Sequence, residues 1–108
     1  MKYFPFFLQL EKLPCLIVGG GSVAERKLDL LIKASADITI VSIDFTDYIL
    51  ELAKTNNIKC ITQEYSEELL EGNKYKFVIS ATNNLALNQQ VAKDCDTHNI
   101  IVNVVDQP

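Results

Sequence analysis

The residues with the clearest chemical potential are three small ones that follow an apolar segment, in the pattern Gly19-x-Gly21-x-x-Ala24. This spacing holds a dinucleotide pyrophosphate when a strand precedes it and a helix follows it. Gly19 permits the tight turn, the missing side chain at Gly21 lets backbone N–H groups approach phosphate oxygens, and Ala24 lets the helix pack near the strand. A helix beginning near Ser22 directs its partial positive end at the anion. A glycine-rich turn that binds nothing is the alternative.

Asp44 is the acidic residue best placed to recognise a ribose. It lies about 20 residues beyond the glycine turn, the offset at which a carboxylate accepts hydrogen bonds from ribose hydroxyls. The alternatives are an acid in a surface turn and the N-cap of the next helix, a role that either Asp44 or Thr46 could fill. No Arg or Lys occurs between Asp37 and Leu52, so a 2′-phosphate would meet like charge. We therefore expect NAD to be preferred over NADP.

A polar run follows the apolar segment 77–80. Thr82, Asn83 and Asn84 precede a predicted helix, so they are candidates for helix caps and for ligand contacts alike. Asn88 lies one helical turn beyond Asn84 and could support the same loop. An exposed position on the helix is the simpler expectation for Asn88.

Two further residues could take part in proton chemistry. Asp106 ends an apolar strand expected to reach the nicotinamide side of the cleft, where a carboxylate between apolar neighbours is suited to proton transfer. A turn aspartate beside Pro108 is the alternative. His98, the single histidine, lies in a polar connection at the opposite end of the predicted sheet. We expect it to be a solvated loop residue, neither a base nor a metal ligand.

These residues must be positioned by alternating strands and helices. Apolar runs predict strands at Cys15–Val18, Ile38–Ile43, Ile58–Thr62, Phe77–Ser80 and Ile100–Val105. Between them, helical segments are predicted at Val23–Ala34, Thr46–Lys54, Glu67–Leu70 (a short turn) and Leu85–Cys95. Continuously apolar strands between helices indicate a parallel sheet covered on both faces. The predicted fold is a Rossmann-like, doubly wound α/β domain, whose ligands bind beyond the carboxyl ends of the strands where strand order reverses.

The composition fits one soluble domain. A chain of 108 residues with 48% hydrophobic content buries roughly two thirds of its unfolded surface. The net charge of −4 and the absence of any basic run longer than Arg26-Lys27 argue against a nucleic-acid or anionic-membrane partner. Three widely spaced cysteines, Cys15, Cys60 and Cys95, favour reduced, buried thiols in a cytoplasmic protein. No segment reaches the ~20 apolar residues of a membrane-spanning helix.

Four segments are more specific than the glycines alone. They are Phe6-Phe7-Leu8-Gln9-Leu10, Val18-Gly19-Gly20-Gly21-Ser22-Val23-Ala24-Glu25-Arg26-Lys27, Ala81-Thr82-Asn83-Asn84 with Asn88-Gln89, and Asn103-Val104-Val105-Asp106-Gln107-Pro108. In order and spacing, these segments resemble the NAD-binding domain of sirohaem synthases, the precorrin-2 dehydrogenases, some of which also act as sirohydrochlorin ferrochelatases. The resemblance covers essentially the whole chain.

The resemblance implies a function and assigns roles to residues. It implies that Asp106 is the catalytic aspartate, and that NAD touches Ser22 and Val23 on the phosphate turn and Ile43 and Asp44 after the second strand. The implied reaction moves a hydride from precorrin-2 to NAD, with loss of a proton, to give sirohydrochlorin. In the ferrochelatases, Fe²⁺ is a further substrate.

The resemblance also bears on domain organisation. It implies that residues 1–108 form the NAD-binding domain, and that family members continue into a dimerisation region and a helical region that complete the tetrapyrrole cleft. We therefore expect a homodimer for a longer protein and negligible turnover for this chain alone.

Two other functions share parts of this pattern. A regulatory module that senses NAD without chemistry has the same strand, glycine turn and acidic residue, but such modules usually begin at the glycine strand. Here an aromatic segment precedes that strand. A short-chain reductase needs Tyr-x-x-x-Lys, whereas the fourth residue after Tyr48, Tyr65 and Tyr75 is Leu, Leu and Ile.

Overall fold

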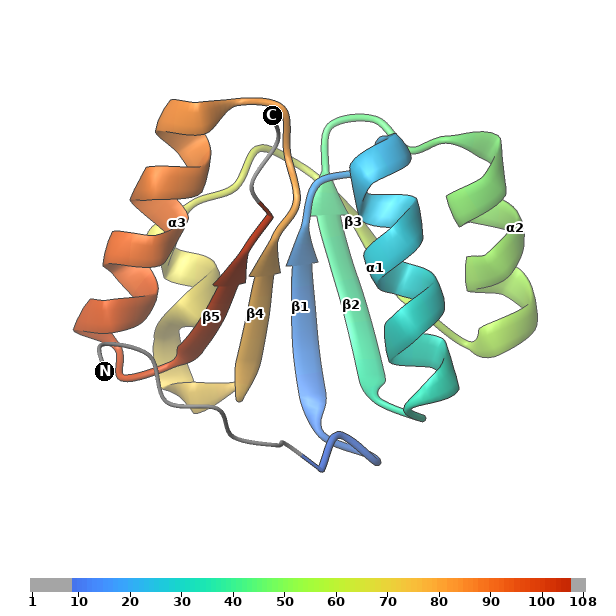
Figure 1. Cartoon of the computed structure of the whole chain (residues 1–108), viewed down its shortest axis with the longest axis horizontal. Helices are drawn as coiled ribbons and strands as arrows, with labels where there is room; N and C mark the ends of the chain where they lie inside the picture. Colours follow the sequence, from blue (N-terminus) through green and yellow to red (C-terminus); the bar gives the residue numbers. More distant parts are fainter. Residues whose placement is uncertain (1–8, 106–108) are drawn as a thin grey trace, which may run out of the picture.

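The computed structural model describes residues 9–105, which form a five-stranded parallel sheet with the strand order β3-β2-β1-β4-β5 (Figure 1). The strands are β1 (Pro14–Val18), β2 (Asp37–Ser42), β3 (Lys59–Thr62), β4 (Phe77–Ser80) and β5 (Ile101–Val104). The chain runs outward from β1 to β3 on one side and returns to place β4 and β5 on the other. Strand order therefore reverses between β1 and β4.

Helices cover both faces of this sheet, as the sequence predicts. The helices α1 (Ser22–Lys33) and α2 (Asp47–Asn56) lie on one face, and the 3₁₀ segment η1 (Glu67–Asn73) and α3 (Leu85–Thr97) lie on the other (Figure 1). Each face has its own apolar cluster, one around Ile17 and Leu28 and the other around Val78 and Val91. A Rossmann-like doubly wound fold is confirmed.

The register of the strands aligns their carboxyl ends beside β1. Val18, the last residue of β1, pairs with Val41 of β2 and with Ser80 of β4. The chain continues this pairing beyond the strands, because the Gly19 N–H donates to the Val41 carbonyl (3.0 Å) and the Ala81 N–H donates to the Val18 carbonyl (2.8 Å). The loops after β1, β2 and β4 therefore leave the sheet next to one another.

The ends of the helices differ slightly from the sequence prediction. Thr46 is the N-cap of α2, because its Oγ1 accepts a hydrogen bond from the Ile49 N–H over 3.2 Å. This assigns the capping role to Thr46 and leaves the Asp44 carboxylate out of it. The short turn predicted to end at Leu70 extends to Asn73, with a kink at Gly72, where φ is +77°.

The structure corrects the expectation for one cysteine and part of the expectation for His98. Cys60 is half-buried, whereas Cys15 and Cys95 are fully buried as predicted, and burial raises the pKa of both buried thiols to about 11. His98 lies in the turn that follows α3, as expected, but it is only partly solvated, because its side chain is 25% exposed and its Nε2 lies 3.0 Å from Oε2 of Glu67. This contact joins α3 to η1.

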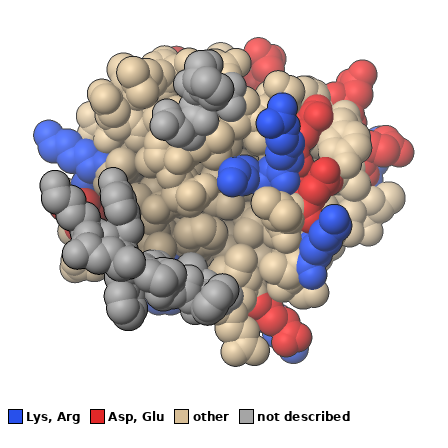
Figure 2. Space-filling model, viewed as in Figure 1, with Lys and Arg blue, Asp and Glu red and all other residues tan. Residues whose placement is uncertain are grey.

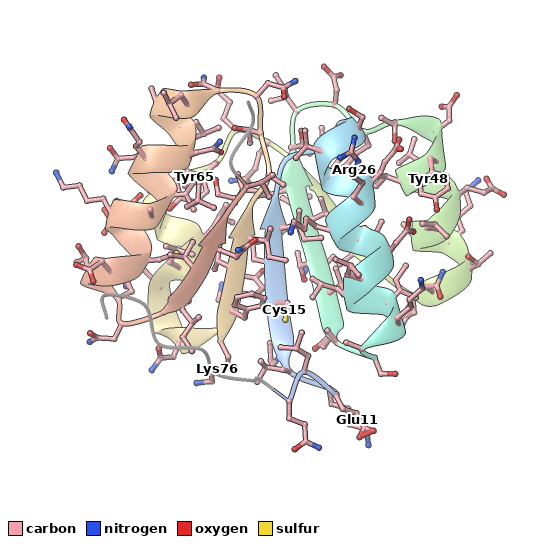
Figure 3. All side chains as sticks on the ribbon, in the orientation of Figure 1. Glu11, Cys15, Arg26, Tyr48, Tyr65 and Lys76 are labelled. Atoms are coloured by element: carbon pink, nitrogen blue, oxygen red, sulfur yellow. The ribbon has the colours of Figure 1, made fainter. Side chains whose placement is uncertain are left out.

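The surface carries both signs of charge. On the face seen in Figure 2, basic and acidic side chains are interspersed over α1 and α2. Tyr48 of α2 reaches towards α1 (Figure 3), and its hydroxyl donates a hydrogen bond of 2.8 Å to Oδ1 of Asp29. None of the helices between residues 9 and 105 has the length and apolar character needed to cross a membrane.

Candidate functional site

The turn after β1 depends on glycine at position 19 for two reasons. Gly19 has a φ of +128°, a backbone conformation that residues other than glycine rarely adopt. A Cβ atom placed there would also lie 2.2 Å from the carbonyl oxygen of Ala81. The sequence predicts the tight turn at this residue, and the structure adds the close approach to the loop after β4.

The structure also requires glycine at position 20, which the pattern Gly19-x-Gly21-x-x-Ala24 leaves open. A Cβ atom at Gly20 would lie 2.1 Å from the carbonyl oxygen of Asp44 and 2.9 Å from Cβ of Ser42. The Gly20 carbonyl in turn accepts a hydrogen bond from the Thr46 N–H over 3.0 Å. This second glycine therefore fixes the loop after β2 against the loop after β1.

Gly21 differs from both of these glycines, because a Cβ atom there would meet no heavy atom within 4 Å. Gly21 is also the N-cap of α1. Its carbonyl accepts the first hydrogen bond of the helix, from the Glu25 N–H over 3.1 Å. The helix therefore makes no internal use of the N–H groups at Ser22, Val23 and Ala24. An open backbone beside free donors at a helix N-terminus is the arrangement that binds phosphate.

A cavity of about 240 Å³ lies over this turn. It is bounded by the whole glycine turn and the start of α1, and from the other side by Thr82 and Asn83 of the loop after β4. Since the cavity lies where strand order reverses, its position matches the place where open α/β sheets bind ligands. The residues present fit a dinucleotide pyrophosphate.

The loop after β4 is held by Asn88, which the sequence places on the helix surface. That expectation is wrong, because Asn88 is only 4% exposed. Its Oδ1 accepts hydrogen bonds of 2.7 Å from both the Ser80 and Thr82 hydroxyls, and its Nδ2 donates to the Thr82 carbonyl over 3.0 Å. Asn84 caps α3 by accepting from the Leu87 N–H. Residues of α3 and its N-cap therefore hold this loop in place without a ligand.

Replacing Asn88 by Ala should destabilise the domain and loosen this loop. The substitution removes three hydrogen bonds and leaves the fully buried Ser80 hydroxyl without its partner, so we expect a loss of about 2–4 kcal/mol in the free energy of unfolding. Urea titration followed by circular dichroism measures this change. Gln89→Ala, at the exposed neighbouring position, serves as the control, and an equal effect of both substitutions would contradict the role of Asn88.

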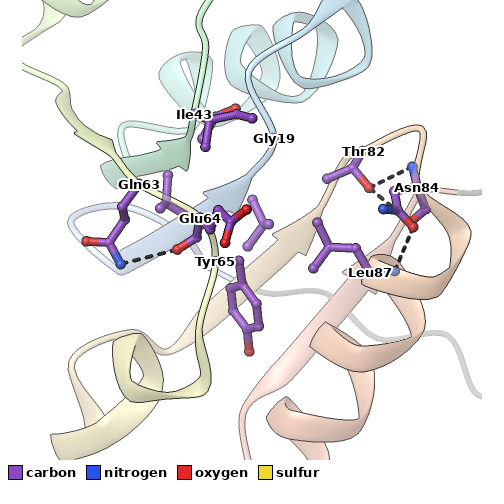
Figure 4. Close-up of a pocket in the computed structure, with 11 residues that line it drawn as sticks. Gly19, Ile43, Gln63, Glu64, Tyr65, Thr82, Asn84 and Leu87 are labelled. Atoms are coloured by element: carbon purple, nitrogen blue, oxygen red, sulfur yellow. Dashed lines mark hydrogen bonds between the residues drawn. The ribbon is translucent and has the colours of Figure 1, made fainter.

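A larger cavity of about 360 Å³ adjoins the first (Figure 4). Four residues line both cavities, namely Gly19, Ser42, Thr82 and Leu87. The larger cavity extends from this shared boundary to the ends of β2 and β3, where Ile43 and the loop 63–65 form its wall. An elongated ligand could therefore occupy both cavities at once.

The structure brings most of the predicted site residues together. Gly19, Gly21, Ser22, Val23, Thr82 and Asn83 line the smaller cavity, and Ile43 lines the larger one. The exposed Asp44 lines neither, although its carbonyl lies against Gly20 and so places the residue beside the turn. Asp106 lies outside the described residues.

The sequence prediction missed the wall supplied by the loop after β3. Gln63, Glu64 and Tyr65 line the larger cavity, together with Leu87 of α3. The sequence does contain a signal for this part of the cavity, because the polar residues Gln63 and Glu64 directly follow the third predicted strand. Within residues 9–105, no group of three or more His, Cys, Asp or Glu side chains is arranged to hold a metal ion.

Comparison with curated proteins finds siroheme synthases. The chain is 45% identical over 107 residues to the siroheme synthase of Psychromonas ingrahamii (strain DSM 17664 / CCUG 51855 / 37). This alignment covers 99% of this chain and 22% of that protein. It is 44% identical over 108 residues to the siroheme synthase of Methylococcus capsulatus (strain ATCC 33009 / NCIMB 11132 / Bath), covering 100% of this chain and 22% of that protein. The chain thus spans about a fifth of the length of these relatives.

Comparison with solved structures finds the same fold in "SirC, precorrin-2 dehydrogenase". The TM-score is 0.78 at 24% sequence identity, and the alignment covers 98% of this chain and 51% of that one. At the level of sequence families, the model described as "Putative NAD(P)-binding" matches residues 6–108. With its glycine turn, open cavity and Rossmann-like sheet, the chain belongs to this NAD(P)-binding family.

Proposed function

We propose that this chain is the NAD-binding part of an enzyme that oxidises precorrin-2 to sirohydrochlorin in sirohaem synthesis. The observation that carries the proposal is the glycine turn, which is open at Gly21 and lines a cavity where strand order reverses. The similarity to siroheme synthases along nearly the whole chain supports the same function, as does the name of the precorrin-2 dehydrogenase that shares its fold.

In this proposal, each part of the cleft binds one part of the cofactor. The backbone N–H groups of Ser22 and Val23 donate to the pyrophosphate, and the Asp44 carboxylate accepts hydrogen bonds from the ribose hydroxyls. Thr82 and Asn83 orient the nicotinamide half from the loop that Asn88 holds rigid. When bound, NAD supplies the hydride-accepting ring, while the protein supplies binding and orientation.

Oxidation of precorrin-2 removes a hydride and a proton. The hydride passes to NAD, and we assign the proton to the carboxylate of Asp106. This residue follows β5, which pairs with β4 beside the cavity, and Val105 is still tied to the sheet through a hydrogen bond of 2.9 Å from its N–H to the Ser80 carbonyl. Val105, the last described residue, is therefore held beside β4, the strand that leads into Thr82.

Asp44 should make the domain prefer NAD over NADP. We expect NAD to bind at least about tenfold more tightly, because a 2′-phosphate would approach the carboxylate with like charge. Asp44→Asn should weaken NAD binding about tenfold or more, since hydrogen bonds to a charged group contribute ~1.5–3 kcal/mol, and it should narrow the gap to NADP. Calorimetric titration measures both affinities.

The matched control for this substitution is Asp47→Asn, at an exposed position in the first turn of α2 that lines neither cavity. It should leave both affinities unchanged. Equal binding of NAD and NADP by the unaltered chain, or unchanged NAD affinity in Asp44→Asn, would remove Asp44 from the site.

A chimera tests the whole function. Residues 1–108 would replace the matching segment of the P. ingrahamii siroheme synthase, to which they are 45% identical. The chimera should reduce NAD in the presence of precorrin-2, as followed by absorbance at the NADH band. Tight NAD binding without precorrin-2 oxidation would instead favour a regulatory module that senses NAD.

Three further assignments belong to the same proposal. We propose Fe²⁺ as a second substrate, a homodimer as the assembly of the longer protein, and the cytoplasm as its location. The three free cysteines fit a reducing compartment. Assaying the chimera for iron insertion into sirohydrochlorin tests the first assignment, and measuring its mass by sedimentation equilibrium tests the second. A chimera that inserts no iron would contradict Fe²⁺ as a substrate, and a monomeric mass would contradict the homodimer.

A further inference from the structure

The larger cavity contains a single formally charged side chain. Among the described residues that line it, Glu64 is the one acidic group, and no Lys, Arg or His accompanies it. Figure 4 shows the Glu64 side chain turned towards the interior of the cavity from the loop after β3. An unpaired carboxylate facing a cavity is an acceptor available to a ligand that brings its own hydrogen-bond donors.

The loop that carries Glu64 is fixed on both sides of it. Before it, the Gln63 N–H donates to the Ser42 carbonyl over 3.1 Å, which ties the loop to the end of β2. After it, the Tyr65 hydroxyl points away from the cavity (Figure 4) and donates to Oδ2 of Asp94 over 2.8 Å. Burial and this hydrogen bond raise the pKa of Tyr65, so its hydroxyl remains protonated as the donor.

Asp94 is an anchor for this loop, although it lies on α3. It is 5% exposed, and its second oxygen, Oδ1, accepts a hydrogen bond of 2.7 Å from Nε2 of Gln90. Both carboxylate oxygens are thus satisfied in a buried position, which costs free energy to rearrange. The backbone on both sides of Glu64 is consequently held in place before a ligand binds.

The order of the strands places the loop that carries Glu64 beyond the loop that carries Asp44, as counted from the glycine turn. The glycine turn follows β1, Asp44 follows β2 and Glu64 follows β3, and these strands are neighbours in the order β1, β2, β3. If the pyrophosphate lies at the turn and the ribose beside Asp44, the next group along the dinucleotide is the base. The cavity at that position has apolar side chains, Ile43 and Leu87, suited to contact the faces of a flat ring.

We propose that Glu64 accepts a hydrogen bond from the 6-amino group of adenine and so selects adenine over bases with a carbonyl at that position. A carboxylate is an acceptor alone, so it attracts the amino group of adenine and repels the carbonyl oxygen of hypoxanthine. The inference rests on the proposed binding of NAD at the glycine turn. It concerns a different part of the ligand from Asp44.

The test compares NAD with nicotinamide hypoxanthine dinucleotide, which differs from NAD in the 6-substituent of the base. The unaltered chain should bind NAD at least about tenfold more tightly, since in the analogue the Glu64 carboxylate loses its hydrogen bond and faces a carbonyl oxygen instead. Glu64→Gln should bring the two affinities within about threefold, because a carboxamide can either donate or accept. Glu64→Ala should also lose the discrimination, without gaining affinity for the analogue.

Two matched variants separate this effect from others. Glu68→Gln, an exposed acid of η1 outside both cavities, should leave both affinities unchanged. Asp44→Asn should lower the affinity for both dinucleotides and keep their ratio, because both carry the same ribose. Thermal unfolding followed by circular dichroism verifies that each variant is folded.

The outcomes distinguish the two proposals. If the unaltered chain binds both dinucleotides equally, or if Glu64→Gln retains the full preference for NAD, base selection by Glu64 is wrong while cofactor binding stands. If the unaltered chain binds neither dinucleotide, the proposed function fails and the role of Glu64 fails with it.

Discussion

Replacing Gly21 by Val is expected to abolish NAD binding while the domain remains folded. A Cβ atom at this position meets no heavy atom within 4 Å, and the backbone has a φ of −102°, which any residue can adopt. The added side chain therefore costs the fold little and extends into the space over the helix start. Several charge-assisted hydrogen bonds to phosphate, each worth ~1.5–3 kcal/mol, would be lost, which amounts to more than about a hundredfold in Kd.

Gly20→Ala is the matched contrast, since it adds a smaller group one residue earlier. Its Cβ atom would lie 2.1 Å from the Asp44 carbonyl oxygen, so the two loops must separate, at a cost of about 3 kcal/mol in the free energy of unfolding. Calorimetric titration and thermal unfolding of both variants make the comparison. If Gly21→Val binds NAD normally, the pyrophosphate does not lie at this turn.

The fold could be predicted because its physical cause is visible in the sequence. β1 is covered by helices on both faces, so it appears as a continuous apolar run, and β2 is apolar between its ends except at the buried Thr39. The segments between them repeat apolar residues at helical spacing, as Leu28 and Leu31 do on the buried side of α1. The bounds of each element were less certain, because caps such as Thr46 decide them through single hydrogen bonds.

The parts of the site that escaped prediction depend on contacts between distant segments. Gly20 must be a glycine because the carbonyl of Asp44, on another loop, approaches it. Asn88 is polar and helical, which suggests exposure, yet it is buried because the hydroxyls of Ser80 and Thr82 need an acceptor. Neither requirement can be read from local periodicity, since each arises only when the sheet has assembled.

Glu64 was missed for a different reason. The residues after the second, fourth and fifth strands were recognised as candidates because parallel strands end at one edge, and the same argument applies to the third. β3 is a four-residue edge strand with exposed ends, so its polar continuation resembles an ordinary surface loop. The bonds that fix this loop, from Gln63 to Ser42 and from Tyr65 to Asp94, connect elements that are distant in sequence.

Asp106→Asn should separate catalysis from cofactor binding. In the chimera with the P. ingrahamii siroheme synthase, this substitution should lower the turnover of precorrin-2 by the ~10²–10⁴-fold expected for a positioned acid or base. The amide is nearly isosteric with the carboxylate but cannot accept the proton that leaves with the hydride. NAD affinity should be unchanged, because the substitution is nearly isosteric and does not alter the phosphate turn or Asp44.

Steady-state kinetics and calorimetry on the same preparations supply both readouts, and Asn103→Asp provides a control, since it alters an exposed residue of β5 just before Asp106. The 108-residue chain alone should bind NAD and show negligible turnover even with Asp106 intact, because it spans about a fifth of the length of its relatives. Full turnover by the Asp106→Asn chimera would refute the proton-accepting role, whereas substantial turnover by the isolated chain would place the whole tetrapyrrole site within these residues.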